Sequence, residues 1–282
     1  MLALPMILQN AITNLVSFLD NIMVGQLGTE QMSGVAIVNQ LIFVYNLAIF
    51  GAASAASIFG AQYFGKGNHE GHMYSFRFKL YATMFVTILA ITLFITNGEN
   101  LISLYLTDTA GTGATDVALR YGKQYLSIML IGLVPFAVTQ SYATNIKETG
   151  QTFVPMAASF VAVGSNAVLD YLLIFGIGPF PKLGVMGAAL ATILARYIEA
   201  AIIVIWAHSH KEKNKYLAGA YRGFGMPMGE FKAILIKGFP LMLNELLWAA
   251  GMTAVTQCYS VRGLEVVAGL NIATTITNLF NI

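Results

Sequence analysis

The sequence predicts an all-α integral membrane protein, with a first six-helix lobe followed by about two helices of a second lobe. Its composition, a series of membrane-length apolar runs and an internal repeat support this prediction. Hydrophobic residues make up 57% of the 282 residues and charged residues only 10%, whereas a soluble domain carries about 25% charged residues. The chain has too few polar groups to cover a water-facing surface, so its expected surroundings are lipid.

The apolar runs set the expected helices, because a helix needs about 20 apolar residues to cross a bilayer. We predict seven helices and the beginning of an eighth. Pro135 falls inside the fourth, which membrane helices tolerate better than soluble ones. The runs cover residues 2–25, 34–61, 76–96, 121–140, 154–177, 185–207, 234–258 and 266–282.

The repeat relates the first two helices to the last two at an offset of 235 residues. Pro5 matches Pro240, and a turn of pattern Gly-x-Glu-x-x-x-Gly begins at Gly28 in one copy and at Gly263 in the other. Parallel repeats occur in transporters. We therefore expect a first lobe over residues 1–215, and a linker with the first two helices of a second lobe over 216–282. An even duplication needs about four more helices, so we expect the chain to be truncated at its carboxyl end.

The basic residues predict the orientation of the helices. With the amino terminus in the cytoplasm, the outer loops hold only Arg120, Lys123, Lys182 and Arg262. An excess of Lys and Arg in cytoplasmic loops is the usual bias, so we expect a multi-pass protein of the cell membrane with a cytoplasmic amino terminus. The loops expected inside hold Lys66, Arg77, Lys79, Lys147, Lys211, Lys213, Lys215, Arg222, Lys232 and Lys237.

The first helix carries a polar stripe at spacings of three and four residues. A polar stripe within lipid must face protein or a water-filled cavity. Packing of small polar groups between helices is the alternative for the stripe as a whole, but a carboxylate has no such packing role. We regard Asn10, Asn14 and Ser17 as candidates for a substrate or proton site. The stripe consists of Asn10, Thr13, Asn14, Ser17, Asp20 and Asn21.

Asp20 and Asp170 are expected at one level of the membrane. At 1.5 Å per residue, Asp20 lies about 8 Å and Asp170 about 10 Å from the outer helix ends. Asn166 shares the face of Asp170 one turn earlier, and Thr192 lies about 12 Å deep. Two carboxylates, an amide oxygen and a hydroxyl suit a hard monovalent cation, and the carboxylates equally suit a proton. The sequence does not choose between Na⁺ and H⁺.

Three further charges fall inside the predicted spans. Arg196 and Glu199 are three residues apart on one helix, and we expect an intrahelical ion pair that neutralises both. Glu245 lies about halfway along the seventh helix beside Asn244. Glu245 is a candidate second protonatable site, or an anchor for a cationic substrate.

Other chemistry finds no support in the sequence. Cys258 is the one cysteine, so neither a disulfide within the chain nor a cysteine metal site is expected. No Walker motif and no HExxH motif occurs, and no basic stripe suggests nucleic acid. We expect no enzyme, no cofactor beyond a coupling ion, and no metal other than Na⁺ at the cation site.

Four segments together resemble the multidrug and toxic compound extrusion (MATE) family. They are ALPMILQNAITNLVSFLDNIMVGQLG at 3–28, SNAVLDYLLIFG at 165–176, LGVMGAALATILAR at 183–196 and FPLMLNELLWAAG at 239–251. The resemblance covers nearly the whole chain and implies a twelve-helix fold of two lobes around a central cavity. It also implies export of amphipathic, often cationic, organic compounds in exchange for Na⁺ or H⁺.

The resemblance further implies which residues bind the cation. They are Asp20, Asn166, Asp170, the carbonyl of Ala188, and Thr192, while the seventh-helix carboxylate of the family falls on Glu245. Helices nine to twelve of the family are absent from this chain. The implied partners are the bilayer and a small organic substrate, and the full-length protein is expected to be a monomer. The alternatives are a lipid-linked saccharide flippase of the same two-lobe plan and a non-transporting fragment.

Overall fold

The computed structural model describes residues 19–106, 113–222 and 225–280, and these residues form helices and connecting turns. Residues 19–25 are helical. Six of the helices are long and apolar enough to cross a membrane, with α4, η1 and α5 counted as one span. The chain is therefore an all-α multi-pass membrane protein, as predicted. The elements are α2 (Thr29–Gly65), α3 (His69–Ser103), α4 (Ala114–Met129), η1 (Leu130–Gly132), α5 (Leu133–Glu148), α6 (Phe153–Phe175), α7 (Val185–Ser209), η2 (Lys215–Leu217), α8 (Met228–Ser260) and α9 (Leu264–Phe280).

Several helices are longer than the apolar runs that predicted them. Helix α3 has 35 residues and begins at His69, where the Asn68 side chain accepts a hydrogen bond from the Gly71 N–H at 2.9 Å. A helix keeps forming backbone hydrogen bonds beyond the apolar stretch, so hydropathy alone underestimates its length. The expectation that Arg77, Lys79, Lys147, Lys232 and Lys237 lie in inner loops was wrong, because all five lie within helices. Helix extension accounts for Lys147 and Lys232, whereas the other three already fall inside predicted apolar runs.

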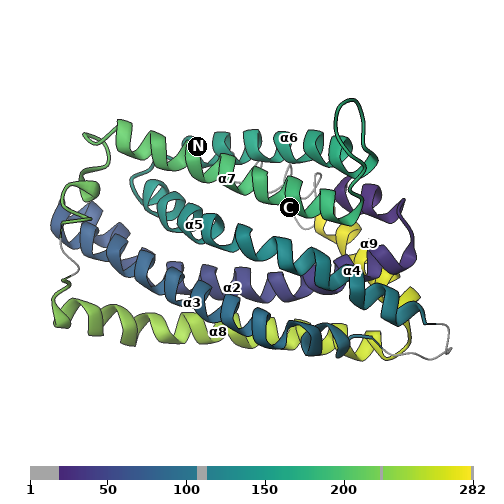
Figure 1. Cartoon of the computed structure of the whole chain (residues 1–282). Helices are drawn as coiled ribbons and strands as arrows, with labels where there is room; N and C mark the ends of the chain where they lie inside the picture. Colours follow the sequence, from purple (N-terminus) through teal and green to yellow (C-terminus); the bar gives the residue numbers. More distant parts are fainter. Residues whose placement is uncertain (1–18, 107–112, 223–224, 281–282) are drawn as a thin grey trace.

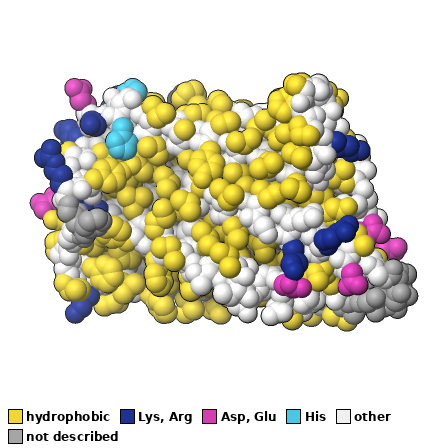
Figure 2. Space-filling model, in the orientation of Figure 1, with side chains coloured by type: hydrophobic (Ala, Val, Ile, Leu, Met, Phe, Trp, Pro, Cys, Tyr) yellow, Lys and Arg dark blue, Asp and Glu magenta, His cyan; other side chains and the backbone are white. Residues whose placement is uncertain are grey.

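Helix α2 is the central element of the bundle. It packs against α3, α4, α5, α8 and α9, while α6 packs mainly on α7 (Figure 1). On the face shown in Figure 2, apolar side chains cover the middle of the molecule and charged side chains gather toward its two ends. This distribution is what a lipid environment requires of a surface.

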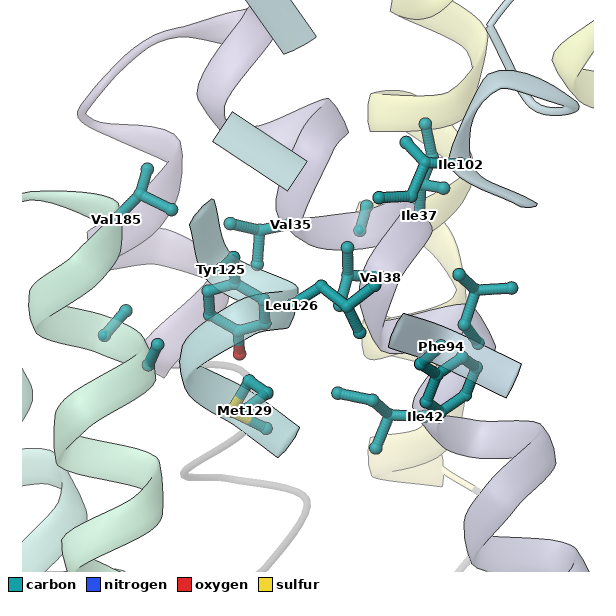
Figure 3. Packing of buried hydrophobic residues seen from close by; sticks show 14 of the residues in the cluster. Val35, Ile37, Val38, Ile42, Phe94, Ile102, Tyr125, Leu126, Met129 and Val185 are labelled. Atoms are coloured by element: carbon teal, nitrogen blue, oxygen red, sulfur yellow. The ribbon is translucent and has the colours of Figure 1, made fainter. Parts of the chain in front are cut away.

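Close helix contacts depend on small residues. A Cβ added at Gly34 of α2 would lie 2.5 Å from the backbone carbonyl oxygen of Ala118 in α4, and one at Gly187 of α7 would lie 2.6 Å from the carbonyl oxygen of Leu173 in α6. Such close backbone approach is typical of membrane helices. Beside these contacts, the main core is formed largely by side chains of α2, α4 and α7, with Phe94 and Ile102 from α3 (Figure 3).

The predicted repeat is visible in the backbone. Gly28 has a φ of 135° and Gly263 a φ of 114°, a region that favours glycine. Each glycine directly precedes a helix with an acidic residue in its first turn, Glu30 in α2 and Glu265 in α9. The same turn therefore starts both helices.

The segment after α7 packs on the first helices of the chain. Tyr216, Leu217 and Ala220 are buried in a cluster with Phe76 of α3 and Tyr142 of α5. Residues 216–222 thus contact the first helices, while the division into lobes at residue 215 remains a prediction. Burial raises the pKa of Tyr216, so its hydroxyl stays neutral at physiological pH.

Candidate functional site

Asp20 and Asp170 come together near one end of the bundle. Asp170 lies near the end of α6 and is fully buried, and Asp20 lies in the helical segment 19–25. The two carboxylates interact electrostatically. Oδ1 of Asp20 and both carboxylate oxygens of Asp170 are buried without a hydrogen-bond partner among the described residues. Buried oxygens of this kind are costly unless a proton or a cation compensates them.

Asn166 and Thr192 supply further polar atoms. Asn166 lies one turn before Asp170 on α6, and its buried Nδ2 also has no partner among the described residues. Thr192 of α7 donates a hydrogen bond to the Ala188 carbonyl at 3.0 Å. Ala188 lies within α7, where its carbonyl also accepts the backbone N–H of Thr192. Both acceptor positions of this oxygen are therefore used while the Thr192 hydroxyl points at it.

Tyr125 of α4 lies beside this group and was missed by the sequence reasoning. Its hydroxyl donates to Asn39 Oδ1 of α2 at 3.3 Å, and it also interacts with Thr192. Both Asp20 and Asp170 act on it electrostatically. Figure 3 shows the Tyr125 ring within the apolar core. An aromatic residue in an apolar run is normally interpreted as part of the core, so no sequence signal identified Tyr125.

Arg196 acts electrostatically on Tyr125, but its guanidinium binds groups outside the aspartate pair. Its guanidinium donates to the Gly132 carbonyl at 3.2 Å and lies 5.0 Å from the ring centroid of Phe136. The predicted direct ion pair with Glu199 was wrong, because Glu199 instead accepts a hydrogen bond from Ser159 at 2.5 Å. The two charges act on each other only at longer range.

Glu245 and Asn244 lie apart from the two aspartates. Glu245 is half-buried against α2, where a Cβ at Gly51 would lie 3.5 Å from its Cβ, and Asn244 is exposed. Glu245 is not among the groups whose charge acts on Asp20 or Asp170. The remaining candidates, Asn10, Asn14 and Ser17, lie outside the described residues.

A second buried polar cluster, which we call the inner cluster, occupies the other end of the bundle. It consists of His72 and Lys79 on α3 and Asn145 and Glu148 on α5. Lys79 is fully buried and donates to both Asn145 and Glu148. His72 Nε2 lies 3.2 Å from Glu148 Oε2 and 3.2 Å from Asn145 Nδ2. From the sequence Lys79 was expected in a loop, so this cluster was not predicted.

The two polar clusters differ in what they can bind. In the inner cluster the charges of Lys79 and Glu148 compensate each other directly. Around Asp20 and Asp170, three carboxylate oxygens from two helical segments lack such compensation among the described residues. The described residues contain no group of three His, Cys, Asp or Glu side chains that could hold a metal ion. Oxygen ligands of this kind suit a hard monovalent cation or a proton.

Comparison with known proteins identifies the family. The family model described as MatE matches residues 5–172. The chain belongs to the MatE family. Its relatives include a probable multidrug resistance protein NorM from Thermotoga maritima, 26% identical over 291 residues, an alignment that covers 99% of this chain and 58% of the relative. A protein named FAD transporter from Shewanella oneidensis is 27% identical over 183 residues, covering 64% of this chain and 38% of that protein.

Solved structures show the same fold for this MatE chain. An inward-facing multidrug resistance MATE family transporter of the MOP superfamily superposes with a TM-score of 0.79 at 22% identity, covering 95% of this chain and 57% of that one. An outward-facing one superposes with a TM-score of 0.76 at 21% identity, covering 99% and 63%. The chain spans about half the length of the curated relatives it matches.

Proposed function

We propose that this MatE chain forms the cation-binding part of an antiporter that exports amphipathic, often cationic, organic compounds in exchange for Na⁺ or H⁺. The observation that carries the proposal is the pair of carboxylates, Asp20 and Asp170, with three buried oxygens that lack a partner among the described residues. A site short of positive charge favours a cation strongly once water is excluded from it. Asn166, Thr192 and the Ala188 carbonyl complete the proposed ligand set, in which the Thr192 hydroxyl turns from the Ala188 carbonyl to the ion and so frees one of its lone pairs.

The proposed mechanism is alternating access between two lobes around a central cavity. Binding of a cation at Asp20 and Asp170 draws the segment 19–25 toward α6, because the ion bridges two carboxylates that otherwise repel each other. A cation shifts the conformational equilibrium only as far as its affinities for the two states differ. Bridging provides such a difference, since a state that separates the two helical segments loses one ligand.

The proposed orientation places the amino terminus and the inner cluster on the cytoplasmic side of the cell membrane. Lys66, Lys211, Lys213, Lys215 and Arg222 lie outside the candidate spans at that end. They support the assignment by the usual excess of basic residues in cytoplasmic loops. The same orientation puts Asp20 and Asp170 in the outer half of the bilayer, and we propose that the protein acts as a monomer.

Cation binding can be tested directly on the purified chain. Thermal unfolding in detergent is followed at constant ionic strength with NaCl or choline chloride, and separately between pH 5.5 and 8. A cation at 100 times its dissociation constant stabilises the native state by about 2.7 kcal/mol. We expect such a shift in the wild type and none in Asp20→Asn or Asp170→Asn. Glu99→Gln is the matched control, because Glu99 is an exposed carboxylate.

Transport requires its own test. Efflux of a cationic dye is measured in reconstituted vesicles, using the protein as the cell makes it, with a Na⁺ gradient and a pH gradient imposed separately. We expect one gradient to drive efflux and both aspartate variants to abolish it while still inserting into the membrane. Efflux that is equal in wild type and variants would remove the role assigned to Asp20 and Asp170.

A further inference from the structure

A hollow of about 620 Å³ lies between the first turns of α3 and the connecting segment 215–222. Its charged lining is mainly basic, with Arg77 from α3 and Lys215 and Arg222 from the connecting segment. Glu70 is the one carboxylate in the lining. The hollow lies at the opposite end of the bundle from Asp20 and Asp170 and shares no residue with the proposed cation site.

Arg77 is the fixed part of this lining. Arg77 as a whole is only 5% exposed. It donates from Nε to the Ala220 carbonyl at 2.9 Å, from Nη1 to Gly225 at 2.6 Å, and from Nη2 to Gly219 at 2.7 Å and Arg222 at 3.1 Å. These neutral acceptors hold the group rigidly without cancelling its charge. A guanidinium has five N–H donors, so one N–H of Nη1 has no acceptor among the described residues.

The acidic side chains nearby are already engaged. Glu70 accepts a hydrogen bond from the Tyr74 hydroxyl at 2.7 Å. Glu230 lies outside the lining and accepts a hydrogen bond from Tyr63. Lys215 and Arg222 take part in none of the ion pairs found among the described residues. The hollow therefore combines an excess of positive charge with a rigid, partly unused guanidinium.

We propose that this hollow binds the phosphate group of an anionic ligand, and that the source of this group is the headgroup of an anionic phospholipid. A guanidinium is well suited to phosphate oxygens, and basic pockets near helix ends bind anionic headgroups. The hollow lies at the end of a helix that can span the membrane, which is the level of the lipid headgroups. The apolar side chain of Met73 and the ring of Tyr74 also line it, and they offer contacts for the glycerol part of a lipid.

The ligand would join two elements, because Arg77 belongs to α3 whereas Lys215 and Arg222 belong to the connecting segment. A bound phosphate would add to the carbonyl contacts of Arg77 and hold that segment more firmly against the first helices. Binding at this site therefore affects the connection between the lobes, not the chemistry of the cation site.

The test measures lipid binding by the purified chain in a neutral detergent, using native mass spectrometry. Phosphatidylglycerol, phosphatidylcholine and inorganic phosphate are titrated separately. The variant Lys215→Gln/Arg222→Gln removes two charges from the hollow. The control Lys211→Gln/Lys213→Gln removes two charges from exposed positions of the same loop, outside the lining. Neither pair touches the proposed cation site, so this test is independent of transport.

We expect phosphatidylglycerol to bind more tightly than phosphatidylcholine, and the hollow variant to bind it about tenfold or more weakly, given the usual contribution of each basic residue near a membrane surface. The control pair should change the affinity by less than about twofold. Equal binding of both lipids, or equal loss in both variants, would overturn the site. Displacement of phosphatidylglycerol by inorganic phosphate at comparable concentration would assign the site to a soluble phosphate and overturn the lipid assignment.

Discussion

Two buried polar clusters at opposite ends of the same bundle solve the problem of polar groups in lipid in different ways. In the inner cluster, Lys79 and Glu148 form a direct ion pair, with Asn145 and His72 as further partners. At the other end, the two acidic side chains of Asp20 and Asp170 lie close enough to act on each other electrostatically. The first arrangement pairs opposite charges within the protein, whereas three carboxylate oxygens of the second have no partner among the described residues. This difference is consistent with an inner cluster that holds the helices together and with the proposed binding of a cation by the aspartate pair.

The largest expected effect comes from breaking the inner cluster. Glu148→Gln leaves the fully buried Lys79 without a carboxylate, and removing one partner of a buried pair costs about 3–5 kcal/mol. The free energy of unfolding, or the unfolding temperature in detergent, measures this loss. The double variant Lys79→Met/Glu148→Leu should recover most of it, because an apolar pair of similar size needs no compensation. If the double variant is no more stable than Glu148→Gln, the ion pair is not the source of the effect.

A smaller loss is expected where α2 approaches the inner cluster. A Cβ at Gly60 would collide with the Glu148 carboxylate, so Gly60→Ala should lower the free energy of unfolding by about 1–3 kcal/mol. Gly164→Ala on α6 is the matched control, because nothing lies within 4 Å of a Cβ there. The control should be neutral or stabilising, by up to about 1 kcal/mol, since alanine favours a helix. Equal effects of both substitutions would show that the inner cluster is not closely packed.

The aspartate pair should respond with the opposite sign. Asp170→Asn removes a buried carboxylate whose oxygens have no partner among the described residues. The free energy of unfolding in choline chloride should therefore rise by about 1 kcal/mol, because a neutral amide is less costly to bury than an unpaired charge. The same variant should lose any stabilisation by Na⁺. A clear loss of stability in choline chloride would mean that Asp170 is a structural residue like Glu148.

The sequence predicted the helices that the structure describes and the proximity of Asp20 and Asp170, because both follow from simple regularities. Membrane helices need long apolar runs, and a carboxylate inside such a run is rare enough to stand out. The inner cluster was missed because Lys79 and Glu148 lie near the ends of apolar runs, where a charge reads as part of a loop. Only the extension of α5 to Glu148, beyond the predicted run 121–140, brings the carboxylate onto a helix opposite Lys79.

Contacts between different helices of the bundle could not be predicted from the sequence either. Arg196 and Glu199 have the spacing of an intrahelical pair, yet each binds a group on another element, Gly132 and Ser159. Spacing along one helix states which residues share a face but not what the neighbouring helix offers. The same limitation hid Tyr125, whose role depends on Asn39 of α2 and Thr192 of α7.

Tyr125→Phe has the smallest expected effect of these variants, because it removes a single hydroxyl beside the aspartate pair. Its bond to Asn39 is long at 3.3 Å, so the free energy of unfolding should fall by only about 0.5 kcal/mol, the lower end for a hydrogen bond. Tyr45→Phe is the control outside the site. The Tyr45 hydroxyl donates to the Leu133 carbonyl at 2.9 Å and lies 3.0 Å from Thr87 Oγ1, so its loss should cost about 1 kcal/mol or more.

The two tyrosine variants should separate in their response to cations. Tyr125→Phe is expected to change the Na⁺- or pH-dependent stabilisation, because the Tyr125 hydroxyl interacts electrostatically with both aspartates. Tyr45→Phe should lower stability while leaving that dependence unchanged. If Tyr125→Phe alters stability alone, its hydroxyl belongs to the packing of the first helices, and the cation site is confined to α6, α7 and the segment 19–25.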